Sequence, residues 1–406
     1  MQENLQQAIS DIYDVGVNDD NLSLIYQANN DIRMAVNTPD GLSERQQLQN
    51  VVLQGDTWGS ILASVQVDSI AKEVVNSGYG YCYMDKLPVS LLGLVDDMIG
   101  VSDAGYKAQQ LNAVINVKTA EKRLQFGVHK CKSMLIGKNQ EGVINSPLTV
   151  DKWSVSHVHC ATTGVSNLVE TYDGQVNMEQ TDKQRYLGYV LSSKGDNMVN
   201  IREMKNKSVW IIRKIFTKLE SLHLKKYYFE SAIIFLNMLL RSSILYACET
   251  YYNLKETEIR QLERIEEGFL RRMFQINSGC PVSQLYLESG HAPARFAIKK
   301  VRLLFIKSIL EENHESLIYK FLQLQFENPT RGDWASSCLD DMKYLRIEMS
   351  LKDVEMLTKK QFSDILKNSI HKRAFECLMN KRCSKGQEIE YTAENGGLFA
   401  ARIYRY

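Results

Sequence analysis

The sequence predicts an α+β fold in which short strands and helices share the first half and long helices fill the second. Two observations carry this prediction. Up to about Gly195, apolar runs of strand length alternate with turns rich in glycine, proline and aspartate and with helical patterns. Beyond that point apolar residues recur at helical spacing, as in Trp210, Ile211, Ile215, Leu219 and Leu222.

In chain order, the spacing of apolar residues and breakers assigns each element of the first half. We expect helices at 2–16, 22–26, 57–75 and 106–124, and strands at 32–36, 48–53, 91–95, 98–102, 133–136, 155–159 and 186–192. In the second half, helical repeats also cover 259–273 and 303–310, a linker lies around 277–281, and Gly332-Asp333-Trp334 marks the end of a further helix.

Length and composition set the class of protein. A chain of 406 residues exceeds one ordinary core, so we expect several domains, with boundaries after residues 196 and 276. Hydrophobic residues make up 44% and charged residues 24%, which is typical of soluble globular proteins. The longest apolar runs, such as 231–240, are too short to span a bilayer, and the polar N-terminus resembles no signal peptide. We therefore expect no membrane partner.

The eight cysteines are scattered without a C-x-x-C pair, which indicates reduced thiols in the nucleus or cytoplasm. Two loose sets could be considered for zinc, but neither has the compact four-ligand pattern of a zinc site, so ordinary structural roles are favoured. The sets are His371, Cys377 and Cys383, and His157, His159 and Cys160.

The net charge of +1 conceals an uneven distribution. Residues 1–120 contain 6 Lys/Arg against 15 Asp/Glu, whereas the remaining residues contain 43 against 33. An acidic N-terminal segment followed by a basic remainder suits a cation-binding site next to a surface that binds a polyanion. Chance unevenness of surface charge is the alternative.

Asp96 and Asp97 interrupt the apolar segments 91–95 and 98–102, at the tip of a predicted hairpin. Two adjacent carboxylates repel each other, and a divalent cation such as Mg²⁺ neutralises such a pair through oxygen ligands. In polymerases, two such ions clamp the attacking hydroxyl and the leaving pyrophosphate. A solvated turn that happens to hold two aspartates is the plainer reading of this pair alone.

Several ordered blocks over nearly the whole chain resemble the non-LTR (LINE-type) retrotransposon reverse transcriptases. The blocks are LQGDTWGSILASVQVDSIAKE, PVSLLGLVDDMIG, the helix with NAVINVKT, LQFGVHKC, RYLGYVLSSKGDN, ILYACETYY with IRQLERIEEGFLRRMF, SQLYLESGHAPARFAIKKVRLLF and RGDWASS. The resemblance implies a partial polymerase palm over 1–196, an antiparallel sheet with helices on one face. A helical thumb over 197–276 and a helical C-terminal region over 277–406 follow it.

The resemblance also implies roles for single residues. Asp96 and Asp97 are the catalytic carboxylates and the ligands of two Mg²⁺ ions, with Asp96 the surer ligand. Lys130 lies near the leaving pyrophosphate, where an ammonium can neutralise charge or donate a proton. Taken without its neighbours, Lys130 reads as an ordinary surface lysine.

The resemblance implies that five further residues contact the nucleic acid or the deoxynucleotide. Gln54 and Gly55 seat the template base and the incoming nucleotide, and a glycine lets the backbone approach a ligand closely. Tyr186, Leu187 and Gly188 form the primer grip. The plain alternative for these last three residues is an ordinary edge hairpin.

The predicted thumb begins with a strongly basic stretch. Residues 202–226 contain 8 Lys/Arg against 2 acidic residues. Neutralisation of phosphates is independent of base sequence, which suits a polymerase that holds an RNA template and a DNA primer. A solvated helix face is the alternative. The basic residues expected to contact the backbone are Lys205, Lys207, Arg213, Lys214 and Lys218.

The match departs from the family at one essential place. The family's palm carries a further aspartate on a strand ending in D-x-x-x-x-F-D, and no such pattern occurs here; Asp11 and Asp14 lie in a helical pattern. We expect a truncated chain with an incomplete two-metal site and impaired activity. The resulting expectation is an RNA-directed DNA polymerase domain. The alternative is a non-catalytic nucleic-acid-binding remnant of a retroelement.

Overall fold

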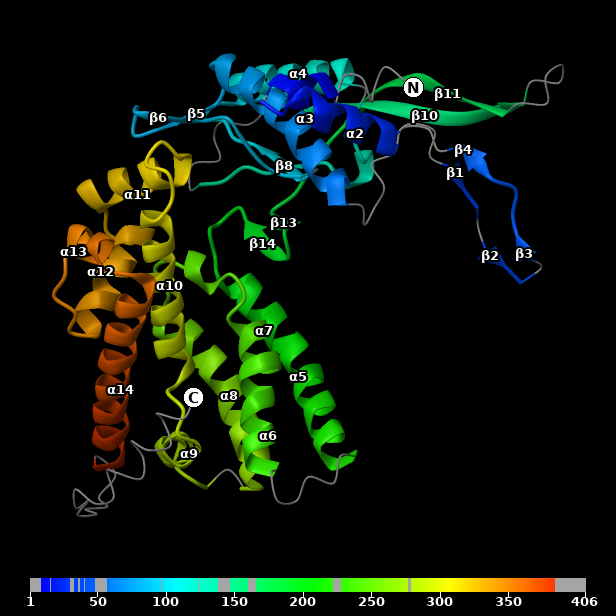
Figure 1. The fold of residues 1–406 in the computed structure, drawn as a ribbon. Helices are drawn as coiled ribbons and strands as arrows, with labels where there is room; N and C mark the ends of the chain where they lie inside the picture. Colours follow the sequence, from blue (N-terminus) through cyan, green and yellow to red (C-terminus); the bar gives the residue numbers. More distant parts are fainter. Residues whose placement is uncertain are drawn as a thin grey trace. The chain divides into compact units, whose positions relative to one another are not determined.

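The computed structural model describes residues 9–14, 16–29, 33–35, 37–39, 41–47, 57–95, 97–122, 124–137, 147–159, 166–221, 228–276 and 279–383. It divides the chain into two compact units, residues 1–195 and 196–406. Helices and small antiparallel sheets occur together, so the predicted α+β class is confirmed (Figure 1).

The first unit combines three long helical elements with short strands. Its helices are α2 (Asp19–Asn29), α3 (Thr57–Asn76) and α4 (Gly105–Glu121), with the 3-10 turn η1 (Val128–Lys130), and residues 9–14 are also helical. Its strands are β1 (Arg33–Met34), β2 (Asn37–Thr38), β3 (Gly41–Leu42), β4 (Gln46–Gln47), β5 (Tyr81–Tyr83), β6 (Leu87–Val89), β7 (Leu91–Leu94), β8 (Asp97–Gly100), β9 (Lys132–Ser133), β10 (Thr149–His159), β11 (Ser166–Asn177), β12 (Glu179–Gln180), β13 (Lys183–Tyr186) and β14 (Tyr189–Ser192).

The strands pair two by two. Among the described residues every sheet has two strands, antiparallel except for β9 with β12, so the single antiparallel palm sheet expected from the sequence is not formed there. One backbone hydrogen bond nevertheless joins the hairpins β5–β6 and β7–β8: Tyr81 N–H donates to the Val101 carbonyl at 3.0 Å. Val101 N–H in turn donates to the Ser90 carbonyl at 2.9 Å, which extends the pairing of β7 with β8 by one position.

The hairpin β7–β8 rests on α3 and α4, with Ile70, Val74, Leu91 and Leu111 buried between these elements. A side chain at Gly93 would come within 3.2 Å of Val67 on α3. Glycine at this position therefore lets the strand lie close against the helix.

The second unit is helical throughout its described residues. It contains α5 (Met198–Ser221), α6 (Tyr228–Phe235), the π-helix η2 (Leu236–Arg241), α7 (Ser242–Ile244), η3 (Cys248–Thr250), α8 (Glu256–Phe274), α9 (Val282–Ser289), α10 (Ala294–Leu310), α11 (Leu317–Glu327), α12 (Trp334–Tyr344), α13 (Leu351–Met356) and α14 (Lys359–Cys383). Helix α5 packs against α6 and α8, while α10 is central and contacts α8, α12 and α14 (Figure 1). The expected division of this region at residue 276 stays a prediction.

Several predicted elements need correction. Gly332-Asp333-Trp334 was expected to end a helix, but it begins α12, because the Asp333 carboxylate accepts a hydrogen bond from Ser336 N–H at 2.6 Å as an N-cap. The single strand expected at 186–192 is a hairpin that turns at 187–188. The strand expected at 133–136 is limited to β9, and the one at 48–53 lies outside the described residues.

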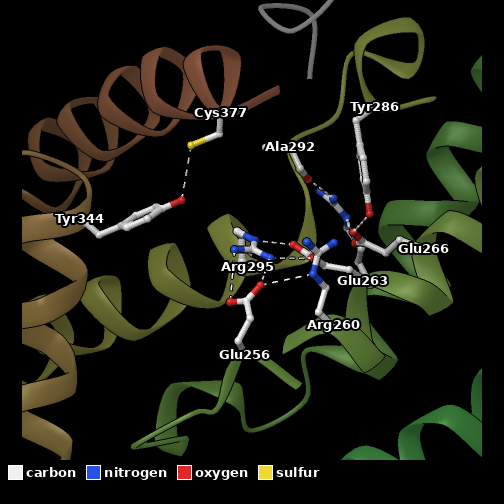
Figure 2. A network of polar contacts seen from close by, with 10 residues as sticks. Glu256, Arg260, Glu263, Glu266, Tyr286, Ala292, Arg295, Tyr344 and Cys377 are labelled. Atoms are coloured by element: carbon white, nitrogen blue, oxygen red, sulfur yellow. Dashed lines mark hydrogen bonds and ion pairs between the residues drawn. The ribbon is translucent and has the colours of Figure 1, made fainter. Parts of the chain in front are cut away.

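A buried ionic network holds the second unit together (Figure 2). Arg241, from the π-helix, makes a 2.8 Å ion pair with Glu266 and donates to the Ala292 carbonyl, and the Tyr286 hydroxyl donates to Glu266 at 3.2 Å. Burial raises the pKa of Glu266, and Arg241 opposes that shift. Removing one partner would leave a buried charge uncompensated and would therefore destabilise this unit.

Within the described part of the chain, no helix combines the length and the apolar character that crossing a bilayer requires.

Candidate functional site

The aspartate hairpin turns through a strained residue. Leu94 pairs with Asp97, which leaves a two-residue loop that starts at Val95. Val95 has φ of +57°, a conformation that costs a β-branched residue on the order of 1–3 kcal/mol. Two-residue hairpin loops demand this left-handed backbone, so the strain follows from the tightness of the turn. The Asp97 side chain is exposed beside it.

A second hairpin, β13–β14, touches the first one. The Tyr186 hydroxyl donates a hydrogen bond to the Asp97 carbonyl at 3.4 Å, across 89 residues of sequence. Burial raises the pKa of Tyr186, and the charge of Asp97 raises it further, so the phenol stays protonated and available as a donor. The structure thus brings together one predicted catalytic residue and one predicted primer-grip residue.

The tip of this second hairpin repeats the geometry of the first. Tyr186 pairs with Tyr189, and the loop between them consists of Leu187 and Gly188 with φ of +48° and +81°. The Leu187 side chain is exposed. Two tight turns, each with a bulky residue at its first loop position, therefore lie in the same unit and are joined by the Tyr186–Asp97 bond.

Lys130 lies at the end of η1 with its side chain exposed. Its backbone N–H donates to the Gly127 carbonyl at 2.7 Å, and a side chain at Gly127 would meet the Lys130 stem at 3.6 Å. The turn therefore presents the ammonium to solvent, and no hydrogen bond or ion pair joins it to Asp97 among the described residues.

Three predicted site residues, Gln54, Gly55 and Asp96, lie outside the described residues. Among those that are described, no three His, Cys, Asp or Glu side chains come together as a metal site. Asp97 is accordingly the one predicted metal ligand whose position the described residues include.

The cysteine and histidine sets are also only partly described. The Cys377 sulfur lies 3.5 Å from the Tyr344 hydroxyl oxygen (Figure 2). Burial lowers the pKa of His371. The side chains of the remaining members, His157, His159, Cys160 and Cys383, lie outside the described part.

In the second unit, α5 presents the predicted basic face to solvent. Its buried side is mostly apolar and packs on α6 and α8, which leaves the cations on the opposite side. The Lys214 ammonium lies 3.7 Å from the centre of the Trp210 ring, and this tryptophan is 59% exposed. Within the described ranges no ion pair neutralises the five predicted cations, all of them exposed: Lys205, Lys207, Arg213, Lys214 and Lys218.

Local patterns did not reveal some contacts that shape the first unit. Asn112 and Asn116 on α4 both donate to the Thr149 carbonyl, at 2.6 and 2.9 Å, and so fasten α4 to β10. Asp11 is buried in a 2.7 Å ion pair with Lys122. The i, i+4 spacing of the two asparagines was a visible signal, because it places both amides on one helix face.

No protein-family model matches this chain, and no curated protein matches it either.

Proposed function

We propose that this chain is the palm and thumb part of a retrotransposon RNA-directed DNA polymerase. The observation that carries the proposal is the bond from the Tyr186 hydroxyl to the Asp97 carbonyl. It links the hairpin that bears the aspartate pair to the hairpin that resembles a primer grip. A polymerase needs this proximity, because the primer end must lie next to the metal-binding carboxylates.

The chemistry of the site would reside at the tip of β7–β8. Asp96 and Asp97 would hold Mg²⁺, which when bound polarises the phosphoryl group and activates the primer hydroxyl. The exposed Asp97 carboxylate suits this role, since Mg²⁺ keeps several water or phosphate ligands. Tyr186 would act as a positioning residue, because it holds the backbone of Asp97 rather than the reacting atoms.

Helix α5 would hold the RNA–DNA hybrid. Its exposed cations can neutralise phosphates, and Trp210 offers a flat apolar surface for a sugar or base. The Lys214 ammonium lies over this exposed ring and so places positive charge beside it.

Primer extension on an RNA template with Mg²⁺ and deoxynucleotides tests the proposal. The family pattern implies a third carboxylate that these 406 residues do not provide, so we expect slow extension. Asp96→Asn and Asp97→Asn should each lower the rate by about a hundredfold or more, since the metals would be misplaced. Asp85→Asn is the matched control, because Asp85 occupies a turn in the adjoining hairpin at φ +54°, where asparagine is well tolerated. Extension that survives in both Asp96→Asn and Asp97→Asn would refute the polymerase.

The exposed basic face of α5 favours a second candidate, binding of nucleic acid without catalysis. Binding of an RNA–DNA hybrid, followed by fluorescence anisotropy, should weaken steeply with salt. The triple variant Lys205→Gln/Lys214→Gln/Lys218→Gln should reduce the slope of log K against log salt by about 2–3.

The matched control for charge is Lys343→Gln/Lys352→Gln/Lys360→Gln, which removes three exposed lysines from other helices of the same unit and should leave the slope unchanged. Salt-dependent binding without any extension selects the second candidate over the first. Equal effects of the two triple variants would contradict a specific role for α5.

A further inference from the structure

The second unit contains a polar cavity of about 500 Å³ beside α10, bounded by the start of α8 and the start of α12. Four cationic side chains line it, whereas only two carboxylates do so. The cations are Arg295, Lys299, Arg302 and Arg331, and the carboxylates are Asp340 and Asp341.

Arg302 forms the wall of this cavity and is only 3% exposed. Its ion pair, from Nε to the Asp341 carboxylate at 3.1 Å, lacks hydrogen-bond geometry, and Nε has no hydrogen-bond acceptor among the described residues. A guanidinium stays charged and offers five donors. Arg302 lines the cavity and makes no hydrogen bond among the described residues, so its terminal nitrogens remain available to a group that enters the cavity.

The local charges favour an anion. Asp341 is shared, because Lys299 also pairs with it at 2.5 Å, so one carboxylate faces two cations. Arg295 is balanced by Glu263 and Glu256 (Figure 2). The exposed Arg331 forms no ion pair within the described ranges and lies at the rim together with Asp340. The cavity wall thus keeps an excess of positive charge.

The rim of the cavity is held in place by hydrogen bonds. Asn253 N–H donates to the Ser337 hydroxyl at 2.9 Å, and Gly332 N–H donates to the Ser336 hydroxyl at 3.1 Å. Both serine hydroxyls donate in turn to the Asp333 carbonyl. Since these hydroxyls are occupied, and Arg295 and Lys299 already donate to carboxylates, the donors left for a ligand are those of Arg302 and Arg331.

We propose that this cavity binds a phosphate group, either as the free ion or as the monoester of a nucleotide. Arginine presents paired donors that match phosphate oxygens, and a cavity of this volume can hold a nucleoside beside the phosphate. The site lies wholly in the unit 196–406 and does not rest on the polymerase function.

Isothermal titration calorimetry of the full chain tests the proposal with two probes, inorganic phosphate and deoxyadenosine monophosphate, at chloride-matched ionic strength. The chain carries Lys205→Gln/Lys214→Gln/Lys218→Gln, so that α5 does not contribute. We expect saturable binding at one site. Arg331→Gln should weaken it by about tenfold, and Asp340→Asn should tighten it, because the first removes and the second adds net positive charge. Lys343→Gln, on the last turn of α12, is the control and should change nothing.

Arg302→Lys keeps the charge but removes the paired donors, and it should also weaken binding by about tenfold. Its folding is checked by circular dichroism, and the exposed Arg331 keeps the test valid if the buried variant fails to fold. Tighter binding of the monophosphate than of phosphate identifies a nucleotide site, and the reverse identifies a site for the ion. The proposal is overturned if neither probe saturates, or if Arg331→Gln binds as the parent chain does.

Discussion

Val95 and Leu187 occupy the same kind of position at the tips of two hairpins that a hydrogen bond connects. Each has a left-handed backbone although it carries a bulky side chain, and each is the first residue of a two-residue loop. Such conformations persist only where the surrounding strands impose them. The strained residues therefore lie in the two loops that, under the proposed function, would be next to the metal ions and the primer.

Val95→Gly should stabilise the chain by about 1 kcal/mol, because relief of the backbone strain exceeds the entropy that glycine loses on folding. Urea unfolding measures the change. Val89→Gly is the control, since Val89 lies in a regular strand of the adjoining hairpin and its loss should be destabilising. A destabilised Val95→Gly would show that the turn carries no strain.

At the scale of elements, the connection from α9 to α10 places a histidine where it cannot be charged. His291 is 7% exposed, and its Nε2 has no hydrogen-bond partner among the described residues. Burial, together with the positive charge of Arg241, lowers the pKa of His291 from 6.5 to about 3. The folded chain therefore requires the neutral imidazole.

This histidine should make stability depend on pH. Its contribution is complete above its ordinary pKa of 6.5 and is lost as the pH falls from there toward 3, at up to about 1.4 kcal/mol per pH unit. His291→Gln should flatten the curve of unfolding free energy against pH between about pH 6 and pH 4. His314→Gln, which alters a largely exposed imidazole, serves as the control. Parallel curves for His291→Gln and the parent chain would contradict the assignment.

Some elements could be predicted from sequence and others could not. Helix α3 and the hairpin β7–β8 follow from long apolar patterns and from the interruption at 96–97. Asp333 was misassigned because glycine and aspartate flank both ends of helices, and only the contact with Ser336 decides between them. Trp210 matches the helical spacing of apolar residues, yet it is exposed beside Lys214.

At the scale of the whole molecule, the chain forms two compact units with separate apolar clusters. Ile70 is fully buried in the first unit, and Leu270 is fully buried in the second. The organisation into two units predicts that each can lose stability without the other, so unfolding should depart from a single two-state transition.

Hydrogen exchange measured by mass spectrometry in graded urea should separate the units. Ile70→Ala should lower the free energy of opening by about 2–5 kcal/mol for peptides from 1–195. Leu270→Ala should lower it by a similar amount for peptides from 196–406. The exposed Val117 and Leu339 provide control substitutions to alanine in the respective units. Loss of protection in both units from either buried substitution would show that they unfold as one.

The candidate site was predictable only in part, because some of its contacts join residues that only the fold of the whole chain brings together. The aspartate pair and the basic stretch of α5 are local patterns, so the sequence displays them directly. The Tyr186–Asp97 bond and the cavity wall of Arg302 and Asp341 join residues far apart in sequence. Such contacts depend on packing, and local periodicity carries no information about them.

The π-helix Leu236–Arg241 makes the winding of the helix the sensitive variable in one part of the second unit. A π-helix holds one residue more than an α-helical turn, and Arg241 at its end reaches Glu266 and the Ala292 carbonyl from this register. Rewinding the same six residues as an α-helix would rotate Arg241 by about 100°. Changes that impose α-helical winding without removing a residue should therefore disconnect the arginine from its buried carboxylate, whereas a one-residue deletion that restores the α-helix should leave it in place.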